Sequence, residues 1–585
     1  MAKPGRVFKR TQAKSTPDLK RILSLPEREW SDWELEQLRD RYTEATRVPG
    51  ATMRLHAIQA QALHEIKEEG GLLGPIAVGG GKTLISFLAP LVAGAKKPLL
   101  ILPAFLVAKT ERERGILSKS FRIPRSIQII SYEFLGREGA QNYLDMVKPD
   151  MLICDEAHRT KNQLAGVTRR IDRYRTAYQE KHGKRLPYVA MSGTLIKDDI
   201  SDFSHLAYWA LGDCSPCPID DGTLLEWSTV LAPQARNPLR EVDPGPMLAL
   251  TMPSEIAEHG ERDAVRRGFQ RRLLATAGVV ASRDGSLGTA LYVDAIEYDV
   301  NEATKKNFKT LRDLWETPDG WALTMAADIN RHAYELALGF HYIWDPRPPD
   351  DWLEARRQWA KFVRETIADS DVLDTEKVVA TACQRGQLPD REFLAWSNIR
   401  KTFLPHSKAI WHDDGPIERV AKWAKEGPGI IWVRHTLFAK RLAKETGLTY
   451  YGADGVSDKG EFIEDAPAKN AIIASAKANG TGRNLQKWSR NLHTAWQPSP
   501  IDAEQLIGRT HRYGQEADAI YLDVMVGCAE HLRAMRSCVT SAQAIEQTIG
   551  HAQKLLRATF TDAWEELRAR EHSSDIRWTK KAGPG

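Results

Sequence analysis

A glycine-rich segment near the start of the chain carries residue types that bind phosphate. Gly79–Gly81 precede Lys82 and Thr83 in GPIAVGGGKTLISFLAP, and an apolar helical pattern follows. Glycine lets backbone N–H groups turn toward a polyphosphate, and a helix N-terminus favours negative charge. Lys82 would reach the outer phosphates and Thr83 would ligate magnesium. Ile76 stands where the strict pattern has its first glycine, so a plain glycine-rich turn is the alternative for this segment alone.

A second candidate site follows an apolar run. MLICDEAH, residues 151–158, ends in Asp155, Glu156 and His158. Ligands bind at the carboxyl ends of strands in open α/β sheets, so Asp155 is expected to hold a magnesium ion that bridges two phosphates. Glu156 would orient or deprotonate the attacking water. An acidic pair that merely begins a helix is the alternative for this motif taken alone.

A third candidate site lies far along the chain, in QLIGRTHRYGQ. Gln505, Arg509 and Arg512 are separated by four and three residues. On a helix, this spacing directs all three side chains to one face. A row of donors on one face is suited to an anion.

Short apolar runs must position these residues. A first group lies at 98–103, 126–131, 151–158 and 188–194, and a second at 429–434, 470–477, 491–496 and 519–526. Runs that are apolar nearly throughout are typical of strands buried on both faces of a parallel sheet. The sequence therefore predicts an α/β fold with two parallel sheets.

The region between the two groups has a different pattern. From about 220 to 408 the periodicity is helical, and we expect amphipathic helices over 301–315 and 321–344. These helices could grip a duplex with Arg and Lys, although a packing role serves equally well.

The composition bounds the class of protein. The 585 residues are too many for one core, and 82 basic against 77 acidic residues leave a charge of +5, which permits a polyanionic partner without requiring one. A zinc site at Cys214 and Cys217 is disfavoured because no second ligand pair follows. The scattered cysteines and the lack of a long apolar run or signal peptide predict a cytoplasmic protein without membrane contact, or a nuclear one in a source with a nucleus.

The motifs together resemble a known family. GGGKT, DEAH, SGT at 192–194 and QLIGRTHRYGQ, in this order, resemble motifs I, II, III and VI of the superfamily 2 helicases and translocases. The resemblance implies two RecA-like parallel-sheet domains, with a helical insertion between them and ATP in their cleft. The implied boundaries are 1–50 for a basic and helical extension, 51–220 and 409–530 for the RecA-like domains, 221–408 for the insertion and linker, and 531–585 for a C-terminal helical extension.

The resemblance also implies roles for single residues. Gln59 is similar to the family's adenine-reading glutamine, and Gly482 lies in ANGTGRNL, which resembles a further motif. Arg509 and Arg512, with Gln505, would act on the γ-phosphate when the domains close. The residues that would couple hydrolysis to movement are His158, Ser192, Gly193 and Thr194.

Details of the motifs favour the Swi/Snf-type branch over the RNA helicases. SGT and the terminal Gln515 of HRYGQ stand where RNA helicases usually carry SAT and HRxGR. Thr494 and Gln497 depart from the branch's usual aspartate and asparagine. A chain of this length without appended histone-reading modules resembles bacterial or bacteriophage members.

The resemblance implies a magnesium- and ATP-dependent helicase or translocase that moves on duplex or single-stranded DNA. An RNA helicase would share every catalytic residue, and a nucleotide-switched interaction protein would bind ATP without moving. The sequence carries no nuclease signature, so any cutting would need a partner protein. A nuclease or a replication protein is the kind of partner that the motor function implies.

Overall fold

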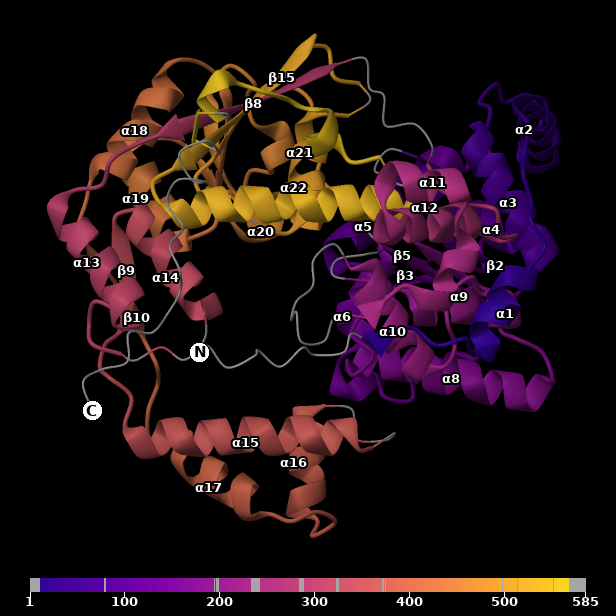
Figure 1. Cartoon of the computed structure of the whole chain (residues 1–585), viewed down its shortest axis with the longest axis horizontal. Coiled ribbons are helices and arrows are strands. Elements are labelled where there is room, and N and C mark those ends of the chain that lie inside the picture. The colour runs from indigo at the N-terminus through magenta and orange to yellow at the C-terminus, as the bar shows by residue number, and fades with distance from the viewer. Residues whose placement is uncertain are drawn as a thin grey trace, which may run out of the picture. The chain divides into compact units, whose positions relative to one another are not determined.

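The computed structural model describes residues 11–567, apart from 78–79, 194, 196–198, 233–241, 283–288, 322, 324–325, 371–372, 374, 497, 513, 551 and 565. The chain divides into two compact units. Figure 1 labels their helices and strands. Unit 1 comprises Met1–Gly285, Phe362–Pro389 and Ser541–Ala552, and unit 2 comprises Ser286–Lys361, Asp390–Thr540 and Gln553–Gly585.

Unit 1 is built on a parallel sheet of five strands. The strand order is β2-β6-β5-β3-β4, and every neighbouring pair is parallel. The strands are β2 (Gly71–Gly74), β3 (Pro98–Leu102), β4 (Gln128–Ser131), β5 (Met151–Asp155) and β6 (Tyr188–Met191). The four apolar runs of the first group are therefore strands, as the sequence predicts.

Alternate residues of these strands enter two separate cores. Leu99 and Leu152 belong to one cluster of buried side chains, whereas Leu100 and Ile153 belong to another. Successive side chains of a strand point to opposite faces, so both faces of the sheet are covered. The main helices of unit 1 are α2 (Asp32–Thr46), α3 (Ala57–Glu69), α4 (Lys82–Ala93), α5 (Ala104–Leu117), α8 (Gly166–His182), α9 (Ser204–Leu211), α10 (Asp221–Leu231), α11 (Pro253–His259), α12 (Glu261–Leu274) and α16 (Glu376–Gln384).

Unit 2 is built on a parallel sheet of seven strands in the order β12-β13-β11-β14-β15-β8-β16. The strands are β8 (Ala290–Glu297), β11 (Gly429–Val433), β12 (Tyr450–Tyr451), β13 (Ala471–Ser475), β14 (Arg490–His493), β15 (Ala519–Val526) and β16 (Thr559–Phe560). The second group of apolar runs is confirmed as β11, β13, β14 and β15. The fold is therefore α/β with two parallel sheets.

The sheet of unit 2 is also packed on both faces, because Ile431 and Ile430 enter different buried clusters. The main helices of unit 2 are α13 (Glu302–Asp313), α14 (Ala326–Ala337), α17 (Arg391–Ile399), α18 (Gly415–Lys425), α19 (Thr436–Thr446) and α21 (Pro500–Thr510). Two further helices, α15 (Asp350–Ala368) and α22 (Ala529–Ile549), contribute residues to both units.

The region expected to be helical between the two sheets differs in part from the sequence prediction. Helix α13 confirms the prediction over 301–315, whereas 321–344 contains α14 followed by the strand β9 (Phe340–Trp344). Strand β9 pairs with β10 (Ser407–Trp411), so a partner distant in sequence overrides the local helical pattern. Strand β8, from the same region, joins the sheet of unit 2. Helices α10 and α12, also from this region, contribute Trp227 and Phe269 to a core of unit 1.

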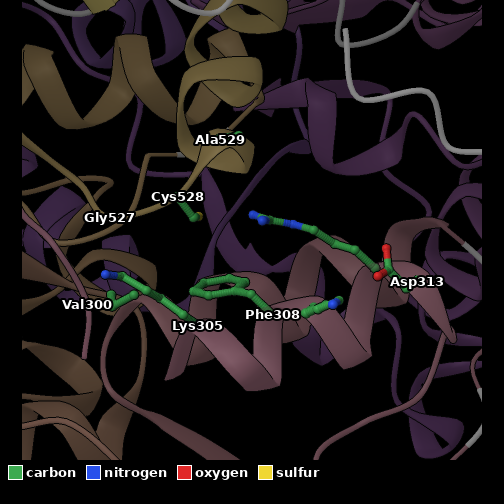
Figure 2. Close-up of a pocket in the computed structure, with 9 residues that line it drawn as sticks. Val300, Lys305, Phe308, Asp313, Gly527, Cys528 and Ala529 are labelled. Carbon is green, nitrogen blue, oxygen red and sulfur yellow. The ribbon is translucent and has the colours of Figure 1, made fainter. Parts of the chain in front are cut away.

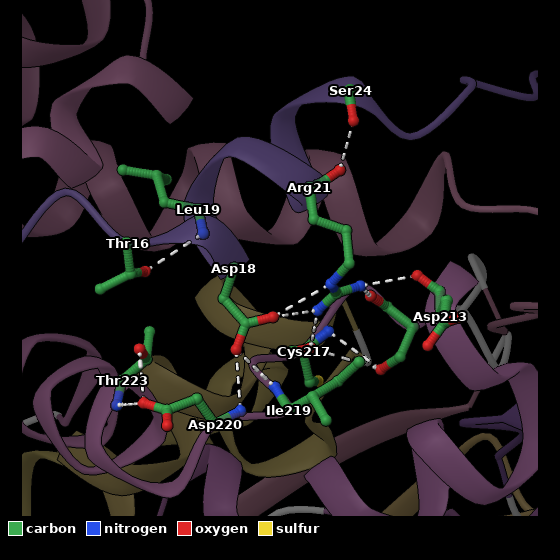
Figure 3. A network of polar contacts seen from close by, with 11 residues as sticks. Thr16, Asp18, Leu19, Arg21, Ser24, Asp213, Cys217, Ile219, Asp220 and Thr223 are labelled. Atoms are coloured by element: carbon green, nitrogen blue, oxygen red, sulfur yellow. Dashed lines mark hydrogen bonds and ion pairs between the residues drawn. The ribbon is translucent and has the colours of Figure 1, made fainter.

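A polar network fixes the short helix α1 (Pro17–Ser24) to the loop that contains Cys214 and Cys217 (Figure 3). The Arg21 guanidinium donates to the carbonyl oxygens of residues 213, 215 and 217 at 2.6–2.8 Å. It also pairs with Asp18, whose other oxygen accepts the N–H groups of residues 219 and 220 at 2.8 Å. The loop is therefore held by an ion pair and backbone hydrogen bonds.

The two cysteines of this loop differ in exposure. Burial raises the pKa of the Cys217 thiol, which disfavours the thiolate that zinc requires, and Cys214 is exposed. Within the described ranges, no three His, Cys, Asp or Glu side chains are grouped to hold a metal ion. None of the helices in that part of the chain is both long and apolar enough to cross a membrane.

We expect Arg21→Ala to lower the free energy of unfolding by about 2–4 kcal/mol, because it leaves a buried carboxylate and three carbonyls short of a donor. Urea unfolding followed by circular dichroism would measure the change. Lys20→Ala removes a neighbouring exposed cation and should have little effect. Equal stability of the two variants would contradict a structural role for the network.

Candidate functional site

The glycine-rich segment connects β2 to α4, at the carboxyl edge of the first sheet. Gly79 lies outside the described residues, and Gly80 and Gly81 lead into α4, which begins at Lys82. The Lys82 Nζ donates to the carbonyl oxygens of Ile76 at 3.0 Å and Ala77 at 3.3 Å. This buried ammonium group is therefore held over the loop, and Thr83 follows it half-buried in the first turn.

The backbone conformation of Gly81 favours glycine, and the end of the Gln59 side chain lies where a Cβ atom would be. Its φ is +75°, and a Cβ atom would lie 1.9 Å from the Nε2 of Gln59. Gln59 donates from Nε2 to the Gly81 carbonyl at 3.4 Å, and its Oε1 accepts the N–H of His56 at 2.8 Å. The structure thus brings Gln59 against the glycine-rich loop.

One contact of this loop could not be predicted from the sequence. Ser282 Oγ accepts the N–H of Ala77 at 2.9 Å, and the Ser282 N–H donates to Pro75 at 3.1 Å. The residues just before Ser282 run alongside β2, where Val280 donates to the Leu73 carbonyl at 3.0 Å. A serine 205 residues along the chain therefore fixes the start of the loop, and no local motif marks it.

Asp155 ends β5 at the same edge of the sheet. Its pKa is raised from 3.8 to about 6, first because burial disfavours the charged carboxylate and second because Glu156 is negative. The charges of Lys82 and His158 oppose this shift, as does the N–H of Glu156, which donates to Asp155 Oδ1 at 3.0 Å. Lys82 and Asp155, which are predicted to act together, are therefore close enough to interact.

Glu156 turns the chain away from the strand. Its φ of 55° and ψ of 47° lie in the left-handed region, which is unfavourable for a residue with a side chain. Its Oε2 lies 3.4 Å from Ser192 Oγ and 3.3 Å from His158 Nδ1, and these two atoms are 2.9 Å apart. The proposed base thus contacts two of the predicted coupling residues.

The remaining coupling residues follow β6. Ser192 is fully buried, and its N–H donates to the Gly74 carbonyl at 3.0 Å, one strand away. Gly193 is the next residue, and Thr194 lies outside the described residues. Motifs from β2, β5 and β6 are therefore adjacent at one sheet edge.

The third candidate site gathers in unit 2. Arg509 donates from Nη1 to the Arg483 carbonyl at 3.1 Å, and from Nε to the Gln505 carbonyl at 2.8 Å. Arg512 donates from Nη1 to the same Arg483 carbonyl at 3.3 Å and to Asn484 Oδ1 at 2.6 Å. These acceptors directly follow Gly482, whose φ is +74°. Gln505, both arginines and the loop at 482–484 therefore form one cluster.

One geometric prediction about this cluster is wrong. Helix α21 ends at Thr510, with His511 as its C-cap, so Arg512 lies beyond the helix. The N–H of Arg512 instead donates to the Thr510 carbonyl at 3.2 Å within a turn. Arg512 joins Arg509 through a shared acceptor rather than through the face of a helix.

The first-sheet residues fit a magnesium–nucleotide complex. Backbone around Gly80 and Gly81, together with Lys82, would hold phosphates, and the Thr83 hydroxyl and the Asp155 carboxylate are hard oxygen ligands of the kind that Mg²⁺ prefers. Asp155 is a half-buried carboxyl whose pKa is raised by burial, so a bound cation would compensate its charged form. Glu156 would lie next to the metal ligand as a proton acceptor.

No protein-family model and no curated protein matches the sequence.

We expect Asp155→Asn to stabilise the magnesium-free protein by up to about 3 kcal/mol at pH 8, because each tenfold change in proton affinity corresponds to about 1.4 kcal/mol. The pKa of Asp155 is higher in the folded protein than in the unfolded chain. The protein with Asp155 therefore has its full stability below pH 3.8 and loses about this much as the pH rises through about 6. The two proteins should therefore unfold alike near pH 4.

Urea unfolding in the presence of a chelator at both pH values tests this difference. Asp145→Asn, which changes an exposed carboxylate of unit 1, should show no such pH dependence. A difference that is the same at both pH values would contradict the burial of a charge at Asp155.

Proposed function

We propose that the protein is an ATP-dependent motor on DNA, a superfamily 2 helicase or translocase of the Swi/Snf-type branch with two RecA-like domains. The observation that carries the proposal is the meeting of Lys82, Asp155 and Glu156 at the carboxyl edge of one parallel sheet. A glycine-rich loop, a lysine and a strand-end carboxylate are the recurring parts of phosphoryl-transfer sites.

In this proposal, the loop and Lys82 bind the phosphates of ATP, and Thr83 and Asp155 hold magnesium. Bound magnesium would neutralise negative charge on the phosphate oxygens. Glu156 orients the attacking water and accepts its proton. Glu156 contacts both His158 and Ser192, so a change in its charge would be felt directly by these two residues.

Arg509 and Arg512 of unit 2 have the second role in the proposal. They would stabilise the charge that develops on the γ-phosphate, as arginine fingers do. Both are tied to the carbonyl of Arg483, so the loop at 482–484 would respond when they move. Hydrolysis would thereby couple to movement of one domain against the other.

We expect Lys82→Ala and Glu156→Gln each to reduce ATP turnover by about 10²-fold or more, with ATP binding retained in Glu156→Gln. Arg512→Ala should reduce turnover by about 10³-fold or more, because an arginine finger contributes that much. Steady-state ATPase rates and nucleotide-binding titrations measure these effects. Glu180→Gln and Arg419→Ala change exposed residues and serve as controls. Near-normal turnover in Arg512→Ala would contradict the two-domain mechanism.

We expect single-stranded, duplex or forked DNA to stimulate the ATPase more than RNA does. The measurement is a ranking of ATPase rates with the four nucleic acids, followed by strand displacement on the best activator. Stimulation by RNA alone would instead select an RNA helicase. A basal ATPase that no nucleic acid stimulates would favour a nucleotide-switched interaction protein.

A further inference from the structure

A cavity of about 440 Å³ lies in unit 2, and no residue of the arginine cluster lines it. Its walls are one face of α13 and the start of α22 (Figure 2). In Figure 2 the ring of Phe308 lies below Cys528, and the side chain of Lys305 extends to the left of that ring. The lining residues that matter most are Val300, Lys305, Phe308, Lys309, Arg312 and Cys528.

The cavity has a position in the sheet where α/β proteins bind ligands. Strands β8 and β15 are parallel neighbours, and their last residues, Glu297 and Val526, are paired. Val300 lies just beyond β8, and Cys528 just beyond β15. The cavity therefore opens at the carboxyl ends of two adjacent parallel strands.

Three cationic side chains from one helix line this cavity. Lys305, Lys309 and Arg312 follow the spacing of four and three residues that places them on the same face of α13. Both lysines are exposed, and Lys305 contacts Glu302 at 2.9 Å in an exposed pair that contributes little energy. Asp313 also lines the cavity and offsets part of this positive charge.

Arg312 is fixed within the cavity by a buried acid. It donates from Nε and Nη2 to the two oxygens of Glu530 at 3.0 and 2.6 Å, and Arg533 donates to the same carboxylate at 2.8 Å. Burial acts to raise the pKa of Glu530, but the hydrogen bond and charge of Arg312, the charge of Arg533 and a backbone hydrogen bond together lower it. The position of Arg312 is thus set before any ligand arrives.

The aromatic ring in the cavity is not arranged to stack on a base. Phe308 is buried, and the Arg312 guanidinium carbon lies 4.7 Å from the centre of its ring. The charged groups that remain for a ligand are the two exposed lysine ammonium groups, with the exposed Asp313 carboxylate beside them. Such a surface recognises phosphate, and it does so without reading base identity.

We propose that this cavity binds the phosphate backbone of a nucleic-acid strand, through Lys305 and Lys309, with Arg312 as a fixed third cation. The identification of the ligand as a strand rests on the proposed motor function, whereas the phosphate chemistry rests on the cavity itself. The same chemistry would accept the phosphates of a free nucleotide, so the test must separate these two sources.

The test is binding of a fluorescent oligothymidylate of about 20 nucleotides to the full chain without ATP, measured by anisotropy. We expect Lys305→Glu combined with Lys309→Glu to weaken binding about tenfold or more near 50 mM salt, and to reduce the salt slope by about 1.4 because two phosphate contacts are lost. The bound strand should also protect Lys305 and Lys309 from acetylation. A second acetylation experiment uses an excess of ATP in place of the oligonucleotide and measures whether ATP protects the same two lysines.

The matched control is Lys440→Glu combined with Lys444→Glu. These lysines are exposed, lie in the same unit and have the same spacing of four residues on α19. The control should change the affinity less than about twofold. Equal losses in both double variants, or no loss in the Lys305 and Lys309 variant, would overturn the proposal.

The remaining outcomes separate the cavity from the motor. Protection of the two lysines by ATP rather than by the strand would overturn the choice of a nucleic-acid ligand. DNA-stimulated ATPase with unchanged strand binding in the Lys305 and Lys309 variant would retain the motor and reject the cavity. Strand binding that depends on these lysines in a protein without ATPase would retain the cavity and reject the motor.

Discussion

The Asp155 carboxylate at the end of β5 and the buried Lys82 form a pair of charges on which the glycine-rich loop depends. Asp155 is half-buried, and the positive charge of Lys82 offsets part of the cost of its charged form. Lys82 is itself buried and needs the Ile76 and Ala77 carbonyls. These carbonyls belong to the glycine-rich loop. The charges of Lys82 and Asp155 therefore constrain the path of that loop.

Parallel strands account for the way distant motifs meet at this place. In unit 1, β2, β5 and β6 are neighbours, so the residues that follow them emerge at one edge. The Ser192 N–H, which donates to Gly74, links two of these strand ends directly. The same principle places the cavity of unit 2 beyond the paired ends of β8 and β15.

The strands that could be predicted are those whose residues are apolar nearly throughout, such as β3 and β5. Strand β2 has the sequence GLLG, in which two glycines indicate a turn, and its pairing with β6 became visible only in the structure. Gly71 packs against a backbone: an added Cβ atom would lie 2.0 Å from the Ala210 carbonyl oxygen. Strand β9, FHYIW, continues an apolar helical pattern, and pairing with β10 decides its conformation.

Site residues were predictable where the chemistry is local. The order GGGK, DEAH and SGT identifies side chains that the sheet then brings together, because each motif lies at or after the carboxyl end of a strand. The contact of Ser282 with the loop had no such signal, since a serine hydroxyl has no characteristic spacing. The shared acceptor of Arg509 and Arg512 is a backbone carbonyl, which any residue type could supply.

The left-handed backbone of Glu156 lowers the stability of the fold at the position of a predicted functional residue. A left-handed conformation costs a residue with a side chain about 1–2 kcal/mol relative to the right-handed one, and glycine avoids that cost. A sequence optimised for folding alone would therefore favour glycine at residue 156. Such a chain would lose the carboxylate that contacts His158 and Ser192. Selection for thermal stability alone is therefore expected to replace Glu156 early.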